Sequence, residues 1–361
     1  MDSRMDTAIV TYKDESYISE AKSLALSAGY SPSKLILVNR FHTGKYGISE
    51  GKAEVLKEYC RSNNVQLVIV DEKLNTQSLY ELSKYCDCTV IDREKLILEI
   101  FALRARTEEA KLQVKLAELS YELPRIKDYV RLQKMGEQPG FFGYGAYETE
   151  KYYQNIKHRM NVIQEKLAKI RRRRDLYRSH RRKLGLPVVS LAGYTSAGKT
   201  TLFNVLTKSQ LETSSSLFTT LTTTTRKMSI DSLDLLVSDT VGFINRLPHY
   251  MIEAFKSTLE EISYADLVLL VLDVSDQLID FKRKFDTCKR TLEDLNVLDQ
   301  KIITVMNKID RITNDELERK RKIVENDVNN VLPISALDGK GVRELQVYIG
   351  NLLNNKEPVT V

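Results

Sequence analysis

The stretch Gly193-Tyr194-Thr195-Ser196-Ala197-Gly198-Lys199-Thr200 decides the fold of this chain. An apolar run at residues 188–192 precedes it directly, and residues 201–206 continue it with helical character. Glycines at both ends of the loop let backbone N–H groups approach a polyphosphate. The following helix offers unpaired N–H groups and the positive end of its dipole to an anion. The pattern therefore predicts a strand, a phosphate-binding loop and a helix, and with them a nucleoside triphosphate site.

Two side chains at the end of this loop carry the predicted chemistry. Lys199 is expected to reach the terminal phosphates and receives a catalytic role, and the hydroxyl of Thr200 is expected to bind Mg²⁺. A Gly-rich surface turn is the alternative, and the apolar run before the loop argues against it. The predicted nucleotide-binding residues of this segment are Gly193, Tyr194, Thr195, Ser196, Ala197, Gly198, Lys199, Thr200 and Thr201.

A second apolar run, at residues 233–238, ends in Asp239-Thr240-Val241-Gly242. An Asp at the end of a strand beside the phosphate loop can hold Mg²⁺ through water, so Asp239 is a predicted metal and nucleotide residue. Gly242 leaves its backbone N–H free to contact the γ-phosphate, and it is assigned a catalytic role. The next residue is Phe243, which cannot polarise the attacking water as a Gln at this position can.

Base specificity is predicted from a later apolar run at residues 301–306, which leads into Asn307-Lys308-Ile309-Asp310. The Asp310 carboxylate can accept hydrogen bonds from both the ring N–H and the exocyclic amino group of guanine, and adenine offers no such pair of donors. A further run at 331–334 ends in Ser335-Ala336-Leu337, which suits a loop that closes over the base. The predicted ligands are therefore GTP and GDP.

The stretch from Thr219 to Arg226 contains six threonines. It is interpreted as a switch that becomes ordered when a Thr hydroxyl meets Mg²⁺ and the γ-phosphate. A solvated low-complexity loop is the alternative. Several neighbouring threonines are candidates for contacting Mg²⁺ and the γ-phosphate. Thr225 is the one predicted as metal ligand and catalytic residue.

Residues 1–100 alternate short β-rich runs with helical runs. Strands are expected at 8–12, 35–38, 67–71 and 88–92, and helices at 15–28, 49–63 and 74–85. This alternation is typical of a small α/β domain with a parallel sheet. The whole chain is thus predicted as α/β: this N-terminal domain, an antiparallel helical hairpin at residues 101–185, and a Ras-like phosphate-loop GTPase domain at 186–361.

The hairpin is predicted from apolar stripes at residues 94–134 and 150–184, with Pro124 as an interruption. The stripes contain Leu96, Ile100, Leu103, Leu112, Leu116, Leu119 and Leu123, and then Tyr153, Ile156, Met160, Ile163, Leu167, Ile170, Leu176 and Leu184. A Gly-rich loop, residues 136–145, joins them. The aromatic side chains of this loop are Phe141, Phe142 and Tyr144, and Tyr147 follows just after it. They either stack on RNA bases or pack against the hairpin or the first domain.

Charge is concentrated in this segment. Residues 104–183 contain 21 Lys and Arg against 10 Asp and Glu, whereas the whole chain has a net charge of only +6. The density is highest at Arg171-Arg172-Arg173-Arg174, followed by Arg178, Arg181, Arg182 and Lys183. A solvated face is the ordinary explanation of such a run. Because no comparable run of acids faces it in the sequence, contact with the phosphates of a polyanion is preferred.

Composition excludes several other classes. No uninterrupted apolar stretch of about 18 residues exists, so no membrane span is expected. The first residues lack a secretory leader, and a cytoplasmic, monomeric protein is expected. Cys60, Cys86, Cys88 and Cys288 show no C-x-x-C pairing or metal-type spacing with histidines and are interpreted as reduced thiols.

The motifs together resemble one family. The phosphate loop, the stretch Leu217 to Arg226, and the segment from Asp239 to Glu261 are similar to the HflX family of GTPases, in its archaeal form, and residues 51–56 (Gly-Lys-Ala-Glu-Val-Leu) are similar to the family's N-terminal signature. The resemblance implies a GTPase that binds the large ribosomal subunit and its RNA and acts in ribosome dissociation or rescue. It also implies K⁺ near the phosphates, but Ser196 stands where the family commonly has Asn, which puts K⁺ in doubt.

Phe243 and the lack of an obvious arginine finger predict slow intrinsic hydrolysis that groups of the ribosome accelerate. One alternative is a tRNA-modification or metal-handling GTPase, which the scarcity of Cys and His clusters disfavours. The other is a GTP-gated binding module without turnover, which Lys199, Thr200 and Asp239 disfavour.

Overall fold

The computed structural model describes residues 6–134, 146–211, 217–221, 223–231, 233–328 and 330–354. Packing divides the chain into two compact units. The first comprises Met1–Lys169 with Pro248–Ala254, and the second comprises Ile170–Leu247 with Phe255–Val361. The division into three segments at residues 100 and 185 stays a prediction.

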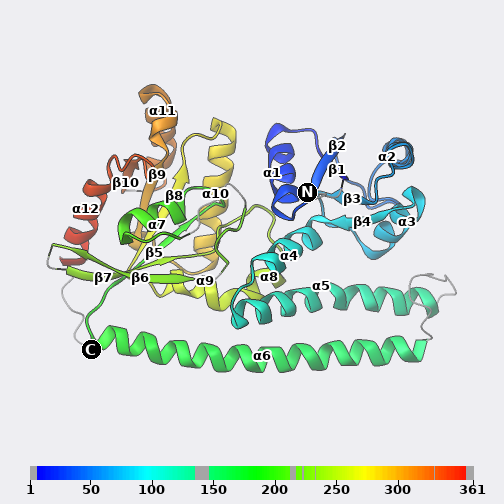
Figure 1. The fold of residues 1–361 in the computed structure, drawn as a ribbon, viewed down its shortest axis with the longest axis horizontal. Helices are drawn as coiled ribbons and strands as arrows, with labels where there is room; N and C mark the ends of the chain where they lie inside the picture. Colours follow the sequence, from blue (N-terminus) through cyan, green and yellow to red (C-terminus); the bar gives the residue numbers. More distant parts are fainter. Residues whose placement is uncertain are drawn as a thin grey trace. The chain divides into compact units, whose positions relative to one another are not determined.

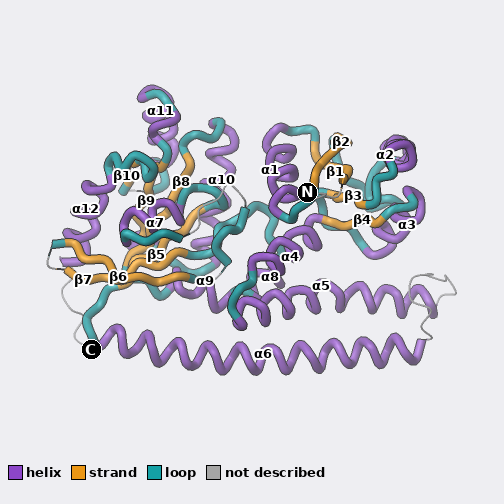
Figure 2. Tube along the Cα trace, viewed as in Figure 1, coloured by secondary structure: helices purple, strands orange, loops and turns teal. Residues whose placement is uncertain are grey.

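The first unit is built on a four-stranded parallel sheet in the order β2-β1-β3-β4 (Figure 1). Helices alternate with these strands along the chain, as the predicted α/β pattern requires (Figure 2). The elements are β1 (Asp6–Tyr12), α1 (Glu15–Ser27), β2 (Ser31–Val38), α2 (Glu50–Asn63), β3 (Leu67–Val70), α3 (Thr76–Cys86) and β4 (Thr89–Asp92). The apolar side chains of β1 and β3 are almost fully buried, so this sheet has the two covered faces typical of parallel sheets.

The predicted helical stretch at 94–134 is two helices, α4 (Arg93–Arg104) and α5 (Glu108–Lys134). Leu103 was expected on the buried stripe, but 65% of it is exposed. Pro124 does not end α5, although it removes one backbone donor. Contacts just beyond it hold the helix, because Ile126 is buried and Arg125 pairs with Asp92 at 2.8 Å.

The second predicted helix of the hairpin is α6 (Ala146–Lys183), a single long helix. Figure 1 shows the chain leaving along α5 and returning along α6. Tyr153, Ile156 and Ile163 are buried as the stripe predicts, whereas Leu176 and Leu184 are 73% and 59% exposed. The buried stripe therefore covers only the first part of α6. The loop aromatics Phe141, Phe142 and Tyr144 lie outside the described residues, and nothing is described of the Tyr147 side chain.

The second unit contains a six-stranded sheet in the order β10-β9-β8-β5-β7-β6. Its strands are β5 (Val188–Gly193), β6 (Thr224–Ile230), β7 (Leu233–Asp239), β8 (Leu267–Asp273), β9 (Ile302–Asn307) and β10 (Val331–Ile334). All neighbours are parallel except β6 and β7, which form an antiparallel pair. The edge strand β6 had no counterpart in the sequence prediction, which treated its first residues as part of a switch loop.

The remaining elements are α7 (Lys199–Thr207), α8 (His249–Ala254), α9 (Lys256–Ser263), α10 (Leu278–Asp294), the short 3₁₀ turns η1 (Asp299–Lys301) and η2 (Ile309–Arg311), α11 (Asn314–Glu325) and α12 (Val342–Asn354). In the second unit the core of the sheet includes Leu191, Val237, Leu269 and Val305, and Phe203 of α7 packs with them. Because β5, β7, β8, β9 and β10 are parallel, their carboxyl ends meet at one edge, where ligands bind in open α/β sheets. Helix α8 belongs to the first unit, although the residues before and after it belong to the second. Its Tyr250 hydroxyl donates to Glu94 Oε2 at 3.0 Å.

Candidate nucleotide-binding site

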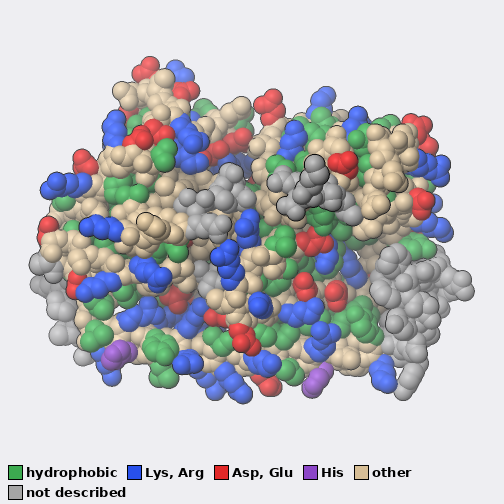
Figure 3. All heavy atoms as spheres, in the orientation of Figure 1, with side chains coloured by type: hydrophobic (Ala, Val, Ile, Leu, Met, Phe, Trp, Pro, Cys, Tyr) green, Lys and Arg blue, Asp and Glu red, His purple; other side chains and the backbone are tan. Residues whose placement is uncertain are grey.

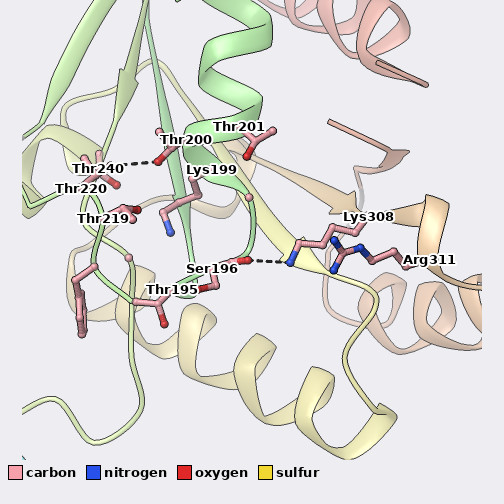
Figure 4. A pocket seen from close by; sticks show the side chains of 13 residues that line it. Thr195, Ser196, Lys199, Thr200, Thr201, Thr219, Thr220, Thr240, Lys308 and Arg311 are labelled. Atoms are coloured by element: carbon pink, nitrogen blue, oxygen red, sulfur yellow. Dashed lines mark hydrogen bonds between the residues drawn. The ribbon is translucent and has the colours of Figure 1, made fainter. Parts of the chain in front are cut away.

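A pocket of about 400 Å³ lies in the second unit, at the carboxyl edge of its sheet. Figure 4 shows hydroxyl groups, Lys199 and Lys308 gathered around it. Its lining comprises Thr195, Ser196, Gly198, Lys199, Thr200, Thr201, Phe218, Thr219, Thr220, Thr240, Gly242, Lys308 and Arg311. Most of the predicted loop residues are in this set, and they are joined by residues of the Thr-rich stretch and of the Asn307–Asp310 motif.

The two outer glycines of the loop are required by their surroundings. Gly193 has a φ of 144°, and a Cβ there would lie 2.2 Å from the carbonyl oxygen of Val271. Gly198 has a φ of 94°, and a Cβ there would lie 2.3 Å from Asn307 Nδ2. Both positions therefore exclude larger side chains, and the loop can pass tightly between β5, β8 and α7.

Lys199 is buried at the start of α7. Its ammonium donates to the carbonyl oxygens of Gly193 at 3.0 Å and Tyr194 at 2.8 Å, so it lies inside the loop. Burial lowers the pKa of Lys199 to about 8, although the Asp239 carboxylate and the Cys288 thiol oppose that shift. A buried cation with an easily lost proton is a group that an incoming phosphate anion would stabilise.

Asp239 lies at the end of β7 and is fully buried. Its Oδ2 accepts from the hydroxyls of Thr200 at 2.9 Å and Thr220 at 2.8 Å. Its Oδ1 is buried without a well-formed hydrogen bond. Burial raises the pKa of Asp239, while Lys199 and the two hydroxyls act in the opposite direction. An orphaned buried carboxylate oxygen beside two hydroxyls is a set of hard oxygen donors that fits Mg²⁺.

The structure places Thr225 away from this group. Thr225 lies in β6, and its hydroxyl bonds with that of Ser238 at 3.0 Å. Thr220 takes the predicted position instead, since its hydroxyl contacts Asp239 and also Thr200 at 3.1 Å (Figure 4). β6 starts at Thr224 and pairs Thr225 with Ser238 of β7, so in this structure Thr225 lies in the sheet, and its role as metal ligand stays a prediction.

The loop after β7 pairs with the phosphate loop through its backbone. The N–H of Thr195 donates to the carbonyl of Phe243 at 2.8 Å, and the N–H of Phe243 donates to that of Gly193 at 3.0 Å. The Tyr194 hydroxyl accepts from the backbone N–H of Asn245 at 2.9 Å. Gly242 faces Thr195 so closely that a Cβ would lie 2.8 Å from its Cγ2. The Phe243 side chain is buried and offers no polar group to the pocket.

The predicted guanine motif connects the phosphate loop to the loop after β10. Asn307 Nδ2 donates to the carbonyl of Ala197 at 2.9 Å, and Asn307 Oδ1 accepts from the N–H of Ala336 at 3.0 Å. Lys308 Nζ donates to the carbonyl of Ser196 at 3.0 Å (Figure 4). These bonds hold the two loops in a fixed relation.

Asp310 lies in η2 beside the pocket and not among its lining residues. Its Oδ1 accepts from the hydroxyl of Ser335 at 2.7 Å, so the carboxylate and the 335–337 loop are joined. Leu337 is 73% exposed and contributes an open apolar surface at this end.

Several residues at the site were not among those predicted from the sequence. Arg311 lines the pocket directly after the guanine motif, and Asp273, at the end of β8, forms an ion pair with Lys308. Thr219 and Thr240 also line the pocket. The signal for Asp273 was present, because it ends an apolar run as Asp239 does.

Three family models match the chain between residues 15 and 308. They are described as "GTP-binding GTPase N-terminal" at residues 15–102, "GTP-binding GTPase Middle Region" at 104–181 and "50S ribosome-binding GTPase" at 188–308. Curated relatives named GTPase HflX are 48% identical in Methanocaldococcus jannaschii, over 86% of this chain and 76% of that protein, and 36% identical in Escherichia coli K12, over 92% and 78%.

The chain belongs to the HflX family of GTPases. It is therefore an enzyme that hydrolyses GTP, and the pocket described above belongs to its guanine-nucleotide-binding domain. The family resemblance and the α/β fold class predicted from sequence are both confirmed.

Solved structures of GTP-binding proteins are also similar to this chain. The crystal structure of SsGBP with GDP matches with a TM-score of 0.56 and 27% identity, covering 97% of this chain and 99% of the other. A Sulfolobus solfataricus GTP-binding protein in complex with GDP matches with a TM-score of 0.52 and 25% identity, covering 98% and 100%. Both neighbours hold a guanine nucleotide. Among the described helices of this HflX chain, none is long and apolar enough to cross a membrane.

Proposed function

We propose that this GTPase is a switch that binds the large ribosomal subunit in its GTP-bound form and acts in ribosome dissociation or rescue. The observation that carries the proposal is the exposed basic surface of α6. Figure 3 shows Lys and Arg side chains spread along the lower edge, where Figure 1 draws this helix. Its exposed cations are Lys151, Lys157, Arg159, Lys166, Lys169, Arg171, Arg172, Arg173 and Lys183. Phosphates of structured RNA are the natural partner of such a surface.

Some of the arginines in this run have structural partners. Arg171 pairs with Glu260 and Arg178 with Glu261, each at 2.6 Å, and both acids lie in α9. These two arginines therefore face single acids that come from a distant part of the sequence. Arg172 and Arg173 are exposed on the same helix and remain the candidates for phosphate contact.

A covalent path supports control of binding by the nucleotide. Gly242 lines the pocket of the second unit, and only five residues separate it from Pro248, where the chain enters the first unit. Residues 243–247 follow directly on the glycine expected to contact the γ-phosphate. A change at Gly242 on binding or loss of the γ-phosphate is therefore transmitted along a very short segment towards α8.

Mg²⁺ is the proposed cofactor, held by Thr200, Asp239 and, when the γ-phosphate is present, Thr220. When bound it would neutralise charge on the phosphates, while Lys199 and the N–H of Gly242 position the γ-phosphate. K⁺ is not included in the proposed site, since Ser196 is exposed and its carbonyl accepts a hydrogen bond from Lys308.

Cosedimentation with separated ribosomal subunits tests the proposal. We expect the protein to pellet with the large subunit in the presence of a non-hydrolysable GTP analogue and to remain in the supernatant with GDP or without nucleotide. Replacing both Arg172 and Arg173 by Glu should weaken the pelleting and reduce its salt dependence, because two phosphate contacts are removed. The matched control replaces the exposed Lys208 and Lys227 of the second unit by Glu, which should leave pelleting unchanged. Equal binding in all three nucleotide conditions would contradict the switch.

A further inference from the structure

A second pocket, of about 350 Å³, lies in the second unit and shares no lining residue with the nucleotide pocket. The last turns of α6, the start of β6 and helix α9 form its walls. Its volume is in the range of sites that hold small ligands, roughly 300–1,000 Å³. Its lining comprises Arg174, Tyr177, His180, Arg181, Thr223, Thr225 and Glu261.

Two ion pairs hold this part of α6 on α9. Arg171 donates to Glu260 and Arg178 to Glu261, each at 2.6 Å. The guanidinium of Arg178 also lies 4.2 Å from the ring centroid of Tyr264. The side chains of Arg178 and Glu261 are only 11% and 10% exposed, so their pair is shielded from solvent. The α6 and α9 walls of the pocket are therefore held in a fixed relation.

The pocket carries a surplus of positive charge. Among its lining residues in the described part of the chain, Glu261 is the only acid, and Arg178 pairs with that carboxylate. Arg174 and Arg181 both line the pocket, and none of the described acids forms an ion pair with Arg181. The N–H donors of a guanidinium match the oxygens of a phosphate in geometry and charge. A phosphate group therefore suits this pocket.

The pocket also presents an aromatic ring to solvent. Tyr177 is 55% exposed, and the guanidinium of Arg173 lies 5.9 Å from its ring centroid. Bases of single-stranded RNA stack on exposed rings while nearby arginines bind their phosphates. An acidic peptide would satisfy the arginines but has no planar base for the ring. The two features together therefore favour RNA.

We propose that this pocket binds one unpaired nucleotide of RNA, with its base on the Tyr177 ring and its phosphate on Arg174 and Arg181. The proposal rests on the proposed function, and it names the form of RNA that this end of α6 contacts. It adds a site for a base to the phosphate contacts expected of Arg172 and Arg173, which lie on the same turns of the helix.

The Thr-rich stretch lines both pockets of the second unit. Thr219 and Thr220 line the nucleotide pocket, whereas Thr223 and Thr225 line the second pocket. The Thr220 hydroxyl contacts Asp239 at 2.8 Å. An RNA nucleotide in the second pocket is thus separated from the proposed Mg²⁺ site by a few residues of one chain segment.

Fluorescence anisotropy tests the stacking contact, with the full-length protein and a fluorescein-labelled single-stranded RNA of about 12 nucleotides and mixed sequence. Tyr177→Ala should weaken binding roughly tenfold, because one base loses its stacking partner. Tyr177→Phe keeps the ring and should bind as the wild type does. The matched control is Tyr152→Ala, which removes an exposed tyrosine near the other end of α6 and should leave the affinity unchanged.

The salt dependence of the same titration tests the phosphate contact. Arg181→Gln should lower the slope of log affinity against log salt concentration by about 0.7, the value for one phosphate of a single strand. Arg290→Gln, an exposed change on α10, is the control and should leave the slope unchanged. Ultraviolet cross-linking followed by mass spectrometry should join a nucleotide to the peptide that contains Tyr177.

Cosedimentation with large ribosomal subunits separates this proposal from the proposed function. Unchanged RNA affinity in Tyr177→Ala would overturn the nucleotide pocket, even if the protein pellets with the subunits. Polyphosphate or polyglutamate that displaces the labelled RNA as well as unlabelled RNA does would also overturn it and would make the pocket a simple anion site or an acidic-peptide site. If Tyr177→Ala loses RNA affinity but the wild type does not pellet with the subunits, the pocket stands and the proposed function fails.

Discussion

The hydroxyl of Thr220 lies 2.8 Å from Asp239 Oδ2 and 3.1 Å from the hydroxyl of Thr200. It joins the Thr-rich stretch to the end of β7 and to the start of α7. These are the two elements whose residues are expected to hold Mg²⁺. Of the threonines between 219 and 225 that the structure describes, Thr220 is the one that contacts both.

Replacing Thr220 by Val should slow GTP hydrolysis roughly tenfold or more, because a hydroxyl that assists the metal and the γ-phosphate is lost while the side-chain shape is retained. Thr225→Val is the matched control, since its hydroxyl contacts Ser238 in the sheet. It should cost about 1 kcal/mol of folding stability and change hydrolysis little. Single-turnover rates of both variants check this, and a larger rate loss in Thr225→Val would restore Thr225 as the switch residue.

Nucleotide affinity should decrease as the pH rises through about 8, because burial lowers the pKa of Lys199 to about 8 and a bound triphosphate raises it again. GTP thus binds the protonated Lys199 more tightly. Below that pH the affinity is at its full value, and above it binding must take up a proton. Calorimetry at about pH 8.5 in two buffers of different ionisation enthalpy measures this uptake.

Lys199→Arg provides the control for the pH dependence, because a guanidinium stays protonated over this range. The variant should show little proton uptake even where its affinity is reduced. Identical uptake in the wild type and the variant would mean that another group titrates.

Guanine recognition is expected to depend on Asp310, which the Ser335 hydroxyl holds at 2.7 Å. Asp310→Asn should weaken GTP binding by roughly 100-fold or more, since an amide cannot accept from both guanine donors, and it should gain binding of xanthosine triphosphate. Asp315→Asn, an exposed change in the first turn of α11, is the control and should leave both affinities unchanged. Full GTP affinity in Asp310→Asn would remove the assignment of the base site.

The local sequence pattern was sufficient to predict those strands and helices that strand-end motifs and alternating apolar runs define. The strands at 188–193, 302–307 and 331–334 are close to their predicted ranges, because runs rich in Val, Leu and Ile suit buried parallel strands. The loop residues Lys199 and Thr200 and the strand-end residue Asp239 converge for the same reason, since parallel strands end at one edge.

Long-range pairing was not available from the sequence. The partners of Arg171 and Arg178 are acids about 80 to 90 positions away, and nothing local to α6 identifies them. The place of Thr225 in a strand was not predicted, because a polar strand at a sheet edge shows no apolar pattern, and β6 is such a strand.

Phe243 is buried and stands where a Gln can orient the attacking water. The free enzyme therefore lacks a water-orienting side chain at this position, and we expect the ribosome to supply such a group. The most direct test is the single-turnover rate of GTP hydrolysis, measured alone and with purified large ribosomal subunits. We predict slow hydrolysis by the isolated protein and an acceleration of roughly tenfold or more by the large subunit, with little effect of the small subunit. Fast hydrolysis by the isolated protein that large subunits leave unchanged would contradict a ribosome-controlled switch.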